Sequence, residues 1–162
     1  MQALTNRAQQ VERKPGKEFF YQSGNSQLLG YIIEKATKQD LSKYAYEKIW
    51  SQIGTEHDAF WSLDQENGDE KAFCCFNGVA RDYARFGQLI LNKGAWGGKQ
   101  IVDSNYVLKA TSPATYLKDR TESDNAVDYY GYQYWIIQHK GMTIPFQNGL
   151  FGQYVFAIKE KN

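Results

Sequence analysis

The sequence has little proline and little cysteine. Three prolines and two cysteines occur in 162 residues, and no repeat or low-complexity linker divides the chain. We therefore expect one domain over residues 1–162. The two cysteines, Cys74 and Cys75, are adjacent, and a bridge between neighbouring residues departs from ordinary disulfide geometry. We expect them to be reduced, buried thiols without a redox or metal role.

Charge of one sign and long apolar runs are also lacking. Nineteen basic residues against eighteen acidic residues leave a formal charge of +1. No run of Lys or Arg can neutralise a row of phosphates, so nucleic acid is not an expected partner. No apolar run approaches the roughly 18 residues that span a bilayer, and residues 1–14 are too polar for a signal peptide. The composition predicts neither a compartment nor an oligomeric state.

Histidine is scarce as well. His57 and His139 lack a second ligand or a nucleophile at useful spacing, so the sequence predicts no metal site and no serine–histidine–aspartate triad. No organic cofactor is expected either. Asp64 and Asp82 receive no catalytic role. With arginines on both sides, Asp82 is expected to form ion pairs on a helix surface, which contribute little to stability.

Apolar side chains at helical spacing predict four helices in residues 26–112. Each of these runs follows a residue that can cap a helix. The predicted helices are 26–37 after Asn25, 41 to near Gly54 after Asp40, 78–93 after Asn77, and a short helix after Asp103 that ends before Pro113.

Strand patterns are confined to the last part of the chain. Residues 130–137 alternate between aromatic or β-branched residues and others, and residues 151–158 form a second such run. Helices followed by strands predict an α+β fold with an incomplete antiparallel sheet. Residues 159–162 resemble a hairpin turn without its second strand, and residues 1–7 resemble the middle of a helix. We therefore expect a partial domain that lacks sequence at both ends, including the last strand and helix.

Five segments resemble the serine beta-lactamase-like superfamily, which includes class C beta-lactamases and penicillin-binding proteins. Residues 20–30, FYQSGNSQLLG, resemble the second active-site motif of class C beta-lactamases and of their esterase, carboxypeptidase and 6-aminohexanoate-dimer hydrolase relatives. The other segments resemble the dimer-hydrolase branch, and together the five cover most of the chain after Pro15. These other segments are 72–77, 80–87, 94–102 and 151–155.

The resemblance implies a catalytic role for Tyr21. In the family, a tyrosine opens a Tyr-x-Asn or Tyr-x-Ser motif nine residues before a helix glycine, and Tyr21 stands at that distance from Gly30, with Ser23 in third place. A lysine ammonium stabilises a neighbouring phenolate, which can then carry a proton between the serine and the leaving group. Without the motif, Tyr21 would be read as one more aromatic core residue.

The nucleophile that the family uses is absent from this sequence. In the family it belongs to a Ser-x-x-Lys motif upstream of the tyrosine, where one helical turn brings the lysine beside the serine. No Ser-x-x-Lys occurs in the 162 residues. We expect the motif to lie in preceding sequence and the chain alone to be inactive.

The oxyanion-hole strand can be aligned in two registers. A gapless beta-lactamase alignment places residues 144–146 on the Lys-Thr-Gly motif and makes Gln147 the N–H donor. The shorter Gly-x-x-Gly-Gln of the dimer-hydrolase branch matches residues 149–153. That register makes Leu150 N–H the donor and lets Gly149 admit a substrate closely. A glycine pair in an ordinary β-turn is an equal alternative. Assigned to substrate binding are Ser23, Gly149, Leu150, Gly152 and Gln153.

Residues 123–125 spell Ser-Asp-Asn, a motif of class A beta-lactamases. They follow the helices in a polar loop, and the position that the motif serves is already filled by residues 21–23. We interpret them as a solvated acidic loop.

The sequence thus predicts a fragment of a serine acyl hydrolase that cleaves an amide or ester through an acyl-enzyme. Its substrate is a small molecule from a family range that spans beta-lactams, D-amino peptides, esters and nylon oligomers. An extended acyl substrate would add main-chain hydrogen bonds to the strand edge at 149–153. The alternative is a non-catalytic module on the same scaffold that binds peptides or other partners.

Overall fold

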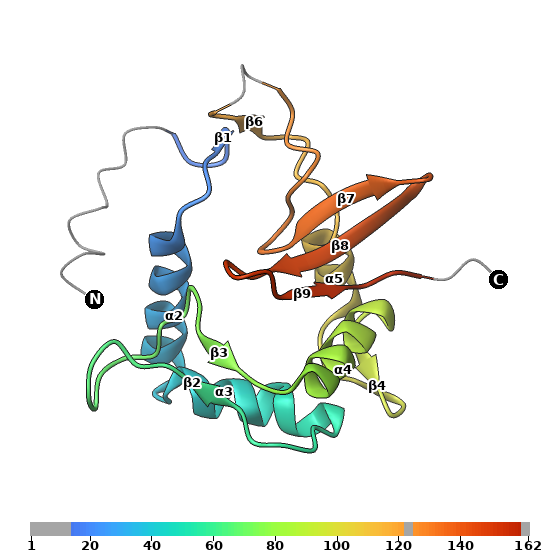
Figure 1. The fold of residues 1–162 in the computed structure, drawn as a ribbon. Helices are drawn as coiled ribbons and strands as arrows, with labels where there is room; N and C mark the ends of the chain where they lie inside the picture. The colour runs from blue at the N-terminus through green and yellow to red at the C-terminus, as the bar shows by residue number, and fades with distance from the viewer. Residues whose placement is uncertain (1–13, 122–124, 160–162) are drawn as a thin grey trace. The chain divides into compact units, whose positions relative to one another are not determined.

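The computed structural model describes residues 14–121 and 125–159, which fall into two compact units (Figure 1). Residues 21–79 make up the first unit, and residues 15–20 with 80–159 make up the second. The expected helical start and the expected turn at the end fall on residues 1–13 and 160–162, outside the described residues. Helices and small sheets occur together, as the predicted α+β class requires.

Two helices dominate the first unit, and they run crosswise to each other in Figure 1. Helix α2 (Ser23–Thr37) is followed by α3 (Leu41–Lys48) and by the 3-10 helix η1 (Trp50–Ile53). The single helix predicted from 41 to near Gly54 is interrupted at Ile49, and only the 3-10 helix η1 continues to Gly54, which has a left-handed φ of 68°. The predicted cap at Asn25 is wrong, since α2 begins at Ser23 and the extended residue before it, Gln22, is the N-cap.

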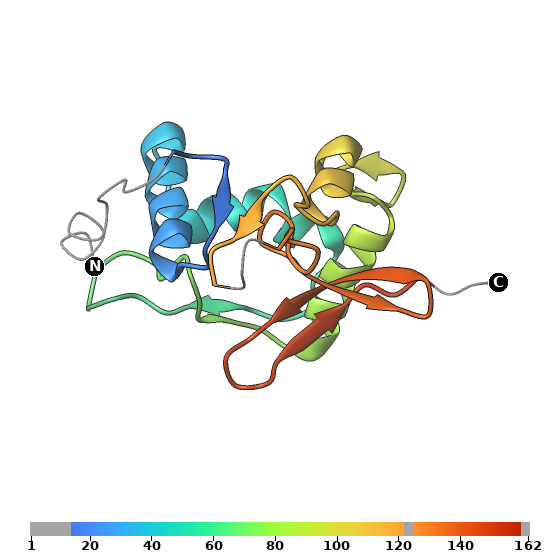
Figure 2. The same ribbon diagram turned by 90° about the horizontal axis from the view of Figure 1, so that it is seen from above.

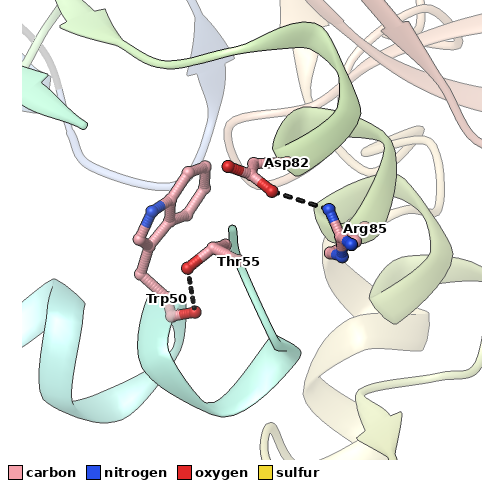
Figure 3. Close-up of polar contacts among 4 residues, drawn as sticks. All are labelled: Trp50, Thr55, Asp82 and Arg85. Carbon is pink, nitrogen blue, oxygen red and sulfur yellow. Dashed lines mark hydrogen bonds and ion pairs between the residues drawn. The ribbon is translucent and has the colours of Figure 1, made fainter. Parts of the chain in front are cut away.

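A short hairpin completes the first unit. Strand β2 (Phe60–Trp61) pairs antiparallel with β3 (Phe76–Asn77). The Trp61 indole N–H donates to the carbonyls of Lys71, at 3.0 Å, and Cys74, at 2.9 Å. Phe76 contacts the Trp50 ring edge to face at 4.9 Å. Below that ring, the Thr55 hydroxyl donates to the Trp50 carbonyl at 3.1 Å and secures the end of η1 (Figure 3).

The prediction that both cysteines are free thiols is wrong. Cys74 and Cys75 are joined by a disulfide in the loop that leads into β3, and Cys75 is exposed rather than buried. Cys75 also has a left-handed φ of 69°. The apolar residues on both sides of the pair gave no sign of this turn conformation. Asn77 is not a helix cap, because it lies in β3 and its amide donates to the Cys75 carbonyl at 2.8 Å.

The second unit contains two helices. Helix α4 (Ala80–Leu91) is followed by a tight hairpin of β4 (Ala95–Trp96) and β5 (Lys99–Gln100), and then by α5 (Ser104–Ala110). The predicted cap of α5 is confirmed, because the Asp103 carboxylate accepts a hydrogen bond from Tyr106 N–H at 2.8 Å.

A three-stranded antiparallel sheet carries the last part of the chain. Strands β7 (Trp135–His139), β8 (Met142–Asn148) and β9 (Tyr154–Phe156) lie in sequence order, with β8 in the middle (Figure 2). The predicted run from 130 was too early, because Tyr130 forms only an isolated bridge to Trp135. Strand β8 was not predicted. Beside the sheet, β1 (Glu18–Phe19) pairs in parallel with β6 (Lys118–Asp119).

The core of the second unit includes a charged side chain. Asp82 has no exposed surface and lies one turn from Arg85, whose guanidinium is 2.7 Å from the carboxylate (Figure 3). Leu89, two turns further along α4, is also fully buried. The expected surface ion pair at Asp82 is therefore wrong, because Asp82 lies on the buried face of α4.

Candidate functional site

The predicted catalytic tyrosine lies directly before helix α2. Tyr21 precedes the cap residue Gln22, and its side chain is 48% exposed. Ser23 is the first helical residue and is exposed as well. The Gln22 carbonyl accepts a hydrogen bond from Asn25 N–H at 3.1 Å, which fixes the first turn. The structure therefore brings Tyr21 and Ser23 together at the N-terminus of α2.

A buried glutamine holds α2 in its position. The Gln27 side chain is 2% exposed and binds backbone groups on both sides: its amide N–H donates to the Glu70 carbonyl at 3.0 Å, and its amide oxygen accepts from Ala72 N–H at 2.9 Å. One turn later, Gly30 has no room for a side chain, since an added Cβ would lie 2.6 Å from the Ala72 Cβ. These contacts fix the rotation of α2 and so the direction of its first turn.

Substitution of Gln27 by leucine is expected to lower the free energy of unfolding by about 1.5 kcal/mol, because the Glu70 carbonyl and the Ala72 N–H lose their hydrogen bonds to Gln27 and keep only the bond between them, at 2.9 Å. Urea denaturation followed by circular dichroism measures the change. Gln88→Leu on the exposed face of α4 is the matched control and is expected to stay within about 0.5 kcal/mol of wild type. Equal stabilities of the two variants would show that the hydrogen bonds of Gln27 do not stabilise the position of α2.

Two carboxyl groups share the start of helix α3. Glu70 is 7% exposed, and its carboxylate accepts a hydrogen bond from Ser42 N–H at 3.1 Å. Burial raises the pKa of Glu34, and the neighbouring Glu70 and Asp69 raise it further, against a backbone hydrogen bond from Leu41. Burial also acts to raise the pKa of Glu70, but hydrogen bonds from Ser42, from its own backbone N–H and from Glu34 together lower that pKa. The pKa of Glu34 and the pKa of Glu70 are therefore shifted in opposite directions.

This pair predicts a stability that peaks in mild acid. The raised pKa of Glu34 adds stability at low pH that is lost as the pH rises through its folded pKa, whereas the lowered pKa of Glu70 adds stability that is lost as the pH falls through its own. Glu34→Gln is therefore expected to be more stable than wild type near pH 7 and similar to it near pH 5. Urea midpoints at both pH values measure this. A pH-independent difference would contradict the assignment.

The predicted oxyanion segment forms the turn between β8 and β9 (Figures 1 and 2). Gly149 N–H donates to the Gln153 carbonyl at 2.8 Å, and Gly152 N–H donates to the Gly149 carbonyl at 3.1 Å. Gly152 has a left-handed φ of 84°, which glycine adopts without steric cost. Gly149 and Gly152 thus have the conformations of a hairpin turn.

Gln153 folds over this turn. Its side-chain oxygen accepts from Phe151 N–H at 3.2 Å and would meet an added Cβ on Gly149 at 2.5 Å. Among the described residues, no backbone carbonyl accepts a hydrogen bond from Leu150 N–H, and Leu150 itself is 90% exposed. Gln147, the donor of the other register, lies inside the middle strand and pairs with Val155.

The predicted site residues therefore form two groups. Tyr21 and Ser23 stand together in the first unit, and the turn residues Gly149, Leu150, Gly152 and Gln153 stand together in the second. Of the rejected Ser-Asp-Asn segment only Asn125 is described, and its carbonyl accepts from Asp119 N–H at 2.7 Å.

Residues 14–121 and 125–159 contain no cluster of metal ligands and no membrane-spanning helix. Within these ranges, no three His, Cys, Asp or Glu side chains come together as a metal site. No helix there is long and apolar enough to cross a membrane.

Sequence reasoning missed one buried carboxylate in the second unit. Asp119 is 3% exposed and accepts hydrogen bonds from the Thr121 N–H and hydroxyl, both at 2.7 Å, and from the Tyr129 hydroxyl. It fixes the loop after β6. No periodic signal marks such a residue, because its donors come from irregular chain.

Comparisons with known proteins agree on one family. A family model described as Beta-lactamase matches residues 5–162. The 6-aminohexanoate-dimer hydrolase of Paenarthrobacter ureafaciens is 30% identical over 94 residues, which cover 56% of this chain and 23% of the relative. An Escherichia coli K12 protein named as a D-alanyl-D-alanine carboxypeptidase is 26% identical in a match that covers 63% of this chain and 33% of the relative.

Solved structures show the same fold. A Bacillus anthracis protein named as a 6-aminohexanoate-dimer hydrolase superposes with a TM-score of 0.77 at 34% identity and covers 89% of this chain. A Bacteroides dorei protein named as a beta-lactamase gives a TM-score of 0.75 at 19% identity over 96% of this chain, a likeness of fold alone. The chain spans 36% and 51% of these two proteins, so it corresponds to part of each.

Proposed function

Because this chain belongs to the beta-lactamase family, we propose that it is part of a serine acyl hydrolase that cleaves an amide or ester bond through an acyl-enzyme. The observation that carries the proposal is the placement of Tyr21 and Ser23 at the start of α2, with Gly30 against Ala72. The names of the relatives, a dimer hydrolase and a carboxypeptidase, support amide substrates. The substrate proposed is a small acyl compound.

Tyr21 is the proposed proton carrier. Its phenolate oxygen takes the proton from the nucleophilic serine hydroxyl as the serine oxygen bonds to the substrate carbonyl carbon. The resulting phenol then gives that proton to the departing amine or alcohol when the tetrahedral intermediate collapses. A half-exposed tyrosine at a fixed helix start can serve both steps without moving its backbone.

The serine and its activating lysine are proposed to lie in sequence upstream of this chain. The 162 residues contain no Ser-x-x-Lys, and the matched relatives are longer than the chain. The chain by itself is then a binding and proton-transfer part without a nucleophile. No metal or organic cofactor takes part in the proposed reaction.

Leu150 N–H is the proposed oxyanion donor from the β8–β9 turn. An N–H that donates to no backbone carbonyl can bind the developing oxyanion without first breaking such a hydrogen bond. The turn is held by Gln153, whose side-chain oxygen accepts from Phe151 N–H. Gly149, Gly152 and Gln153 then act by shaping this edge for an extended acyl group.

Labelling with a fluorophosphonate tests the missing nucleophile. The 162-residue chain is incubated with the reagent and its intact mass is measured beside Tyr21→Phe. We expect no adduct on either chain. A stoichiometric, Tyr21-dependent adduct would place the nucleophilic serine within these residues and overturn the alignment.

Sequencing of the coding region upstream separates the enzyme from its alternative. An in-frame Ser-x-x-Lys, in a longer protein whose serine takes up the fluorophosphonate, is expected. A reading frame without that motif would overturn the hydrolase and favour a binding module that keeps the scaffold.

A further inference from the structure

The disulfide between Cys74 and Cys75 is open to small reagents. Cys75 is exposed and Cys74 is half-buried, in the loop that leads into β3 of the first unit. A dissolved thiol or disulfide can therefore approach Cys75, whereas a cysteine in a packed core would be shielded. Neither cysteine takes part in the proposed hydrolysis.

The backbone of the pair is bound to both strands of the hairpin. The Cys75 carbonyl accepts hydrogen bonds from Ser62 N–H at 3.0 Å and from the Asn77 side chain at 2.8 Å. The Cys74 carbonyl accepts from the Trp61 indole N–H at 2.9 Å. These two carbonyls therefore connect the loop to Ser62, to Trp61 of β2 and to Asn77 of β3.

The left-handed backbone of Cys75 makes the orientation of the Cys75 carbonyl depend on the bridge. Its φ is 69°, a region that residues with a Cβ enter at a steric cost. A bond between neighbouring side chains limits the conformations open to the two residues. Without the bond, Cys75 can return to an ordinary φ, which turns its carbonyl away from Ser62.

We propose that Cys74 and Cys75 form a reversible thiol–disulfide exchange site whose redox state controls the order of the β2–β3 hairpin. In oxidation, the Cys75 thiolate attacks a small disulfide of the glutathione type and displaces one thiolate. The Cys74 thiolate then attacks the Cys75 sulfur and displaces the second. Two protein thiols and one small disulfide give the Cys74–Cys75 bond and two small thiols, which take up the two protons. A small thiol in excess reverses both steps.

Alkylation and intact mass test the exchange itself. The full chain is equilibrated in oxidised or reduced glutathione and then treated with N-ethylmaleimide. We expect no adduct after the oxidised buffer, and both cysteines alkylated after the reduced buffer, with full recovery of the bridge on return to oxidised glutathione. Alkylation of both cysteines after the oxidised buffer would overturn the proposal.

Hydrogen exchange tests the effect on the hairpin. After reduction, the Ser62 amide is expected to exchange about tenfold faster, while the Gly94 amide of the second unit, which donates to the Leu89 carbonyl, keeps its rate. Equal Ser62 rates in both redox states, or an equal acceleration at Gly94, would overturn local control by the bridge.

Two double variants separate the bridge from the backbone. Cys74→Ser with Cys75→Ser is expected to show the fast Ser62 exchange in either buffer. Cys74→Ser with Cys75→Gly also lacks the bridge but accepts a positive φ, so its Ser62 amide is expected to exchange more slowly than in the double-serine chain. Identical exchange in the two variants would contradict a role for the Cys75 conformation.

Discussion

Replacement of Asp82 by alanine is expected to lower the free energy of unfolding by about 3 kcal/mol. Asp82 is fully buried, and its carboxylate lies 2.7 Å from the Arg85 guanidinium. Alanine would leave a charged arginine beside apolar core without its ion-pair partner. This loss of stability lies at the lower end of the range for breaking a buried ion pair, because the Arg85 side chain is 20% exposed and keeps some hydration.

Urea denaturation at neutral pH measures this change, with Asp58→Ala as the matched control. Asp58 is an exposed carboxylate, so its loss is expected to change stability by less than about 0.5 kcal/mol. Asp82→Asn keeps the shape and one acceptor oxygen and is expected to fall between the two. An Asp82→Ala chain as stable as Asp58→Ala would show that the carboxylate contributes nothing to the fold.

If this chain is part of a serine acyl hydrolase, as proposed, replacement of Tyr21 by phenylalanine is expected to lower the kcat of that longer protein by about 10²- to 10⁴-fold. Phenylalanine fills the same space but cannot accept the serine proton or return it to the leaving group. KM is expected to change little, because the ring still lines the site. Initial rates over a range of ester concentrations separate the two constants.

Tyr46→Phe is the control for this measurement. Tyr46 is 58% exposed on α3 and has no role in the proposed reaction, so its variant is expected to keep wild-type rates. Thermal unfolding of the two variants checks that both remain folded. A Tyr21→Phe enzyme with full kcat would show that another group carries the proton and that the motif is misaligned.

The sequence predicted best those features whose interactions join residues close together in the chain. The Asp103 cap of α5 depends on residues within one turn, and it is confirmed. Gly54 does end helical structure, but α3 itself stops earlier, at Lys48. The start of α2 was missed by three residues, because Ser23 and Gly24 carry no apolar side chain to extend the helical pattern. Strand β8 was missed because Pro145 interrupts it, yet Pro145 pairs with Ile136 and its carbonyl accepts from Ala157 N–H.

The candidate site shows the same division. The order of residues 20–30 was enough to select Tyr21 and Ser23 and to relate the chain to its family. Residues 149–153 could be aligned with the Gly-x-x-Gly-Gln pattern, but the sequence did not predict the hydrogen bonds within this turn. The role of Gln153 as a clamp on Phe151 N–H depends on a side chain that folds back on its own turn.

The sequence by itself determined the family, the α+β class, the motif tyrosine and the lack of a Ser-x-x-Lys, because these depend on residue identity and short spacing. Only the tertiary structure decided that Gln27 binds a backbone group 43 residues away, that Asp82 is buried and that Cys75 is exposed. The physical reason is that helical and strand periods report which residues of one element share a face. Burial and hydrogen bonding across the fold are decided by the segments that pack against that face.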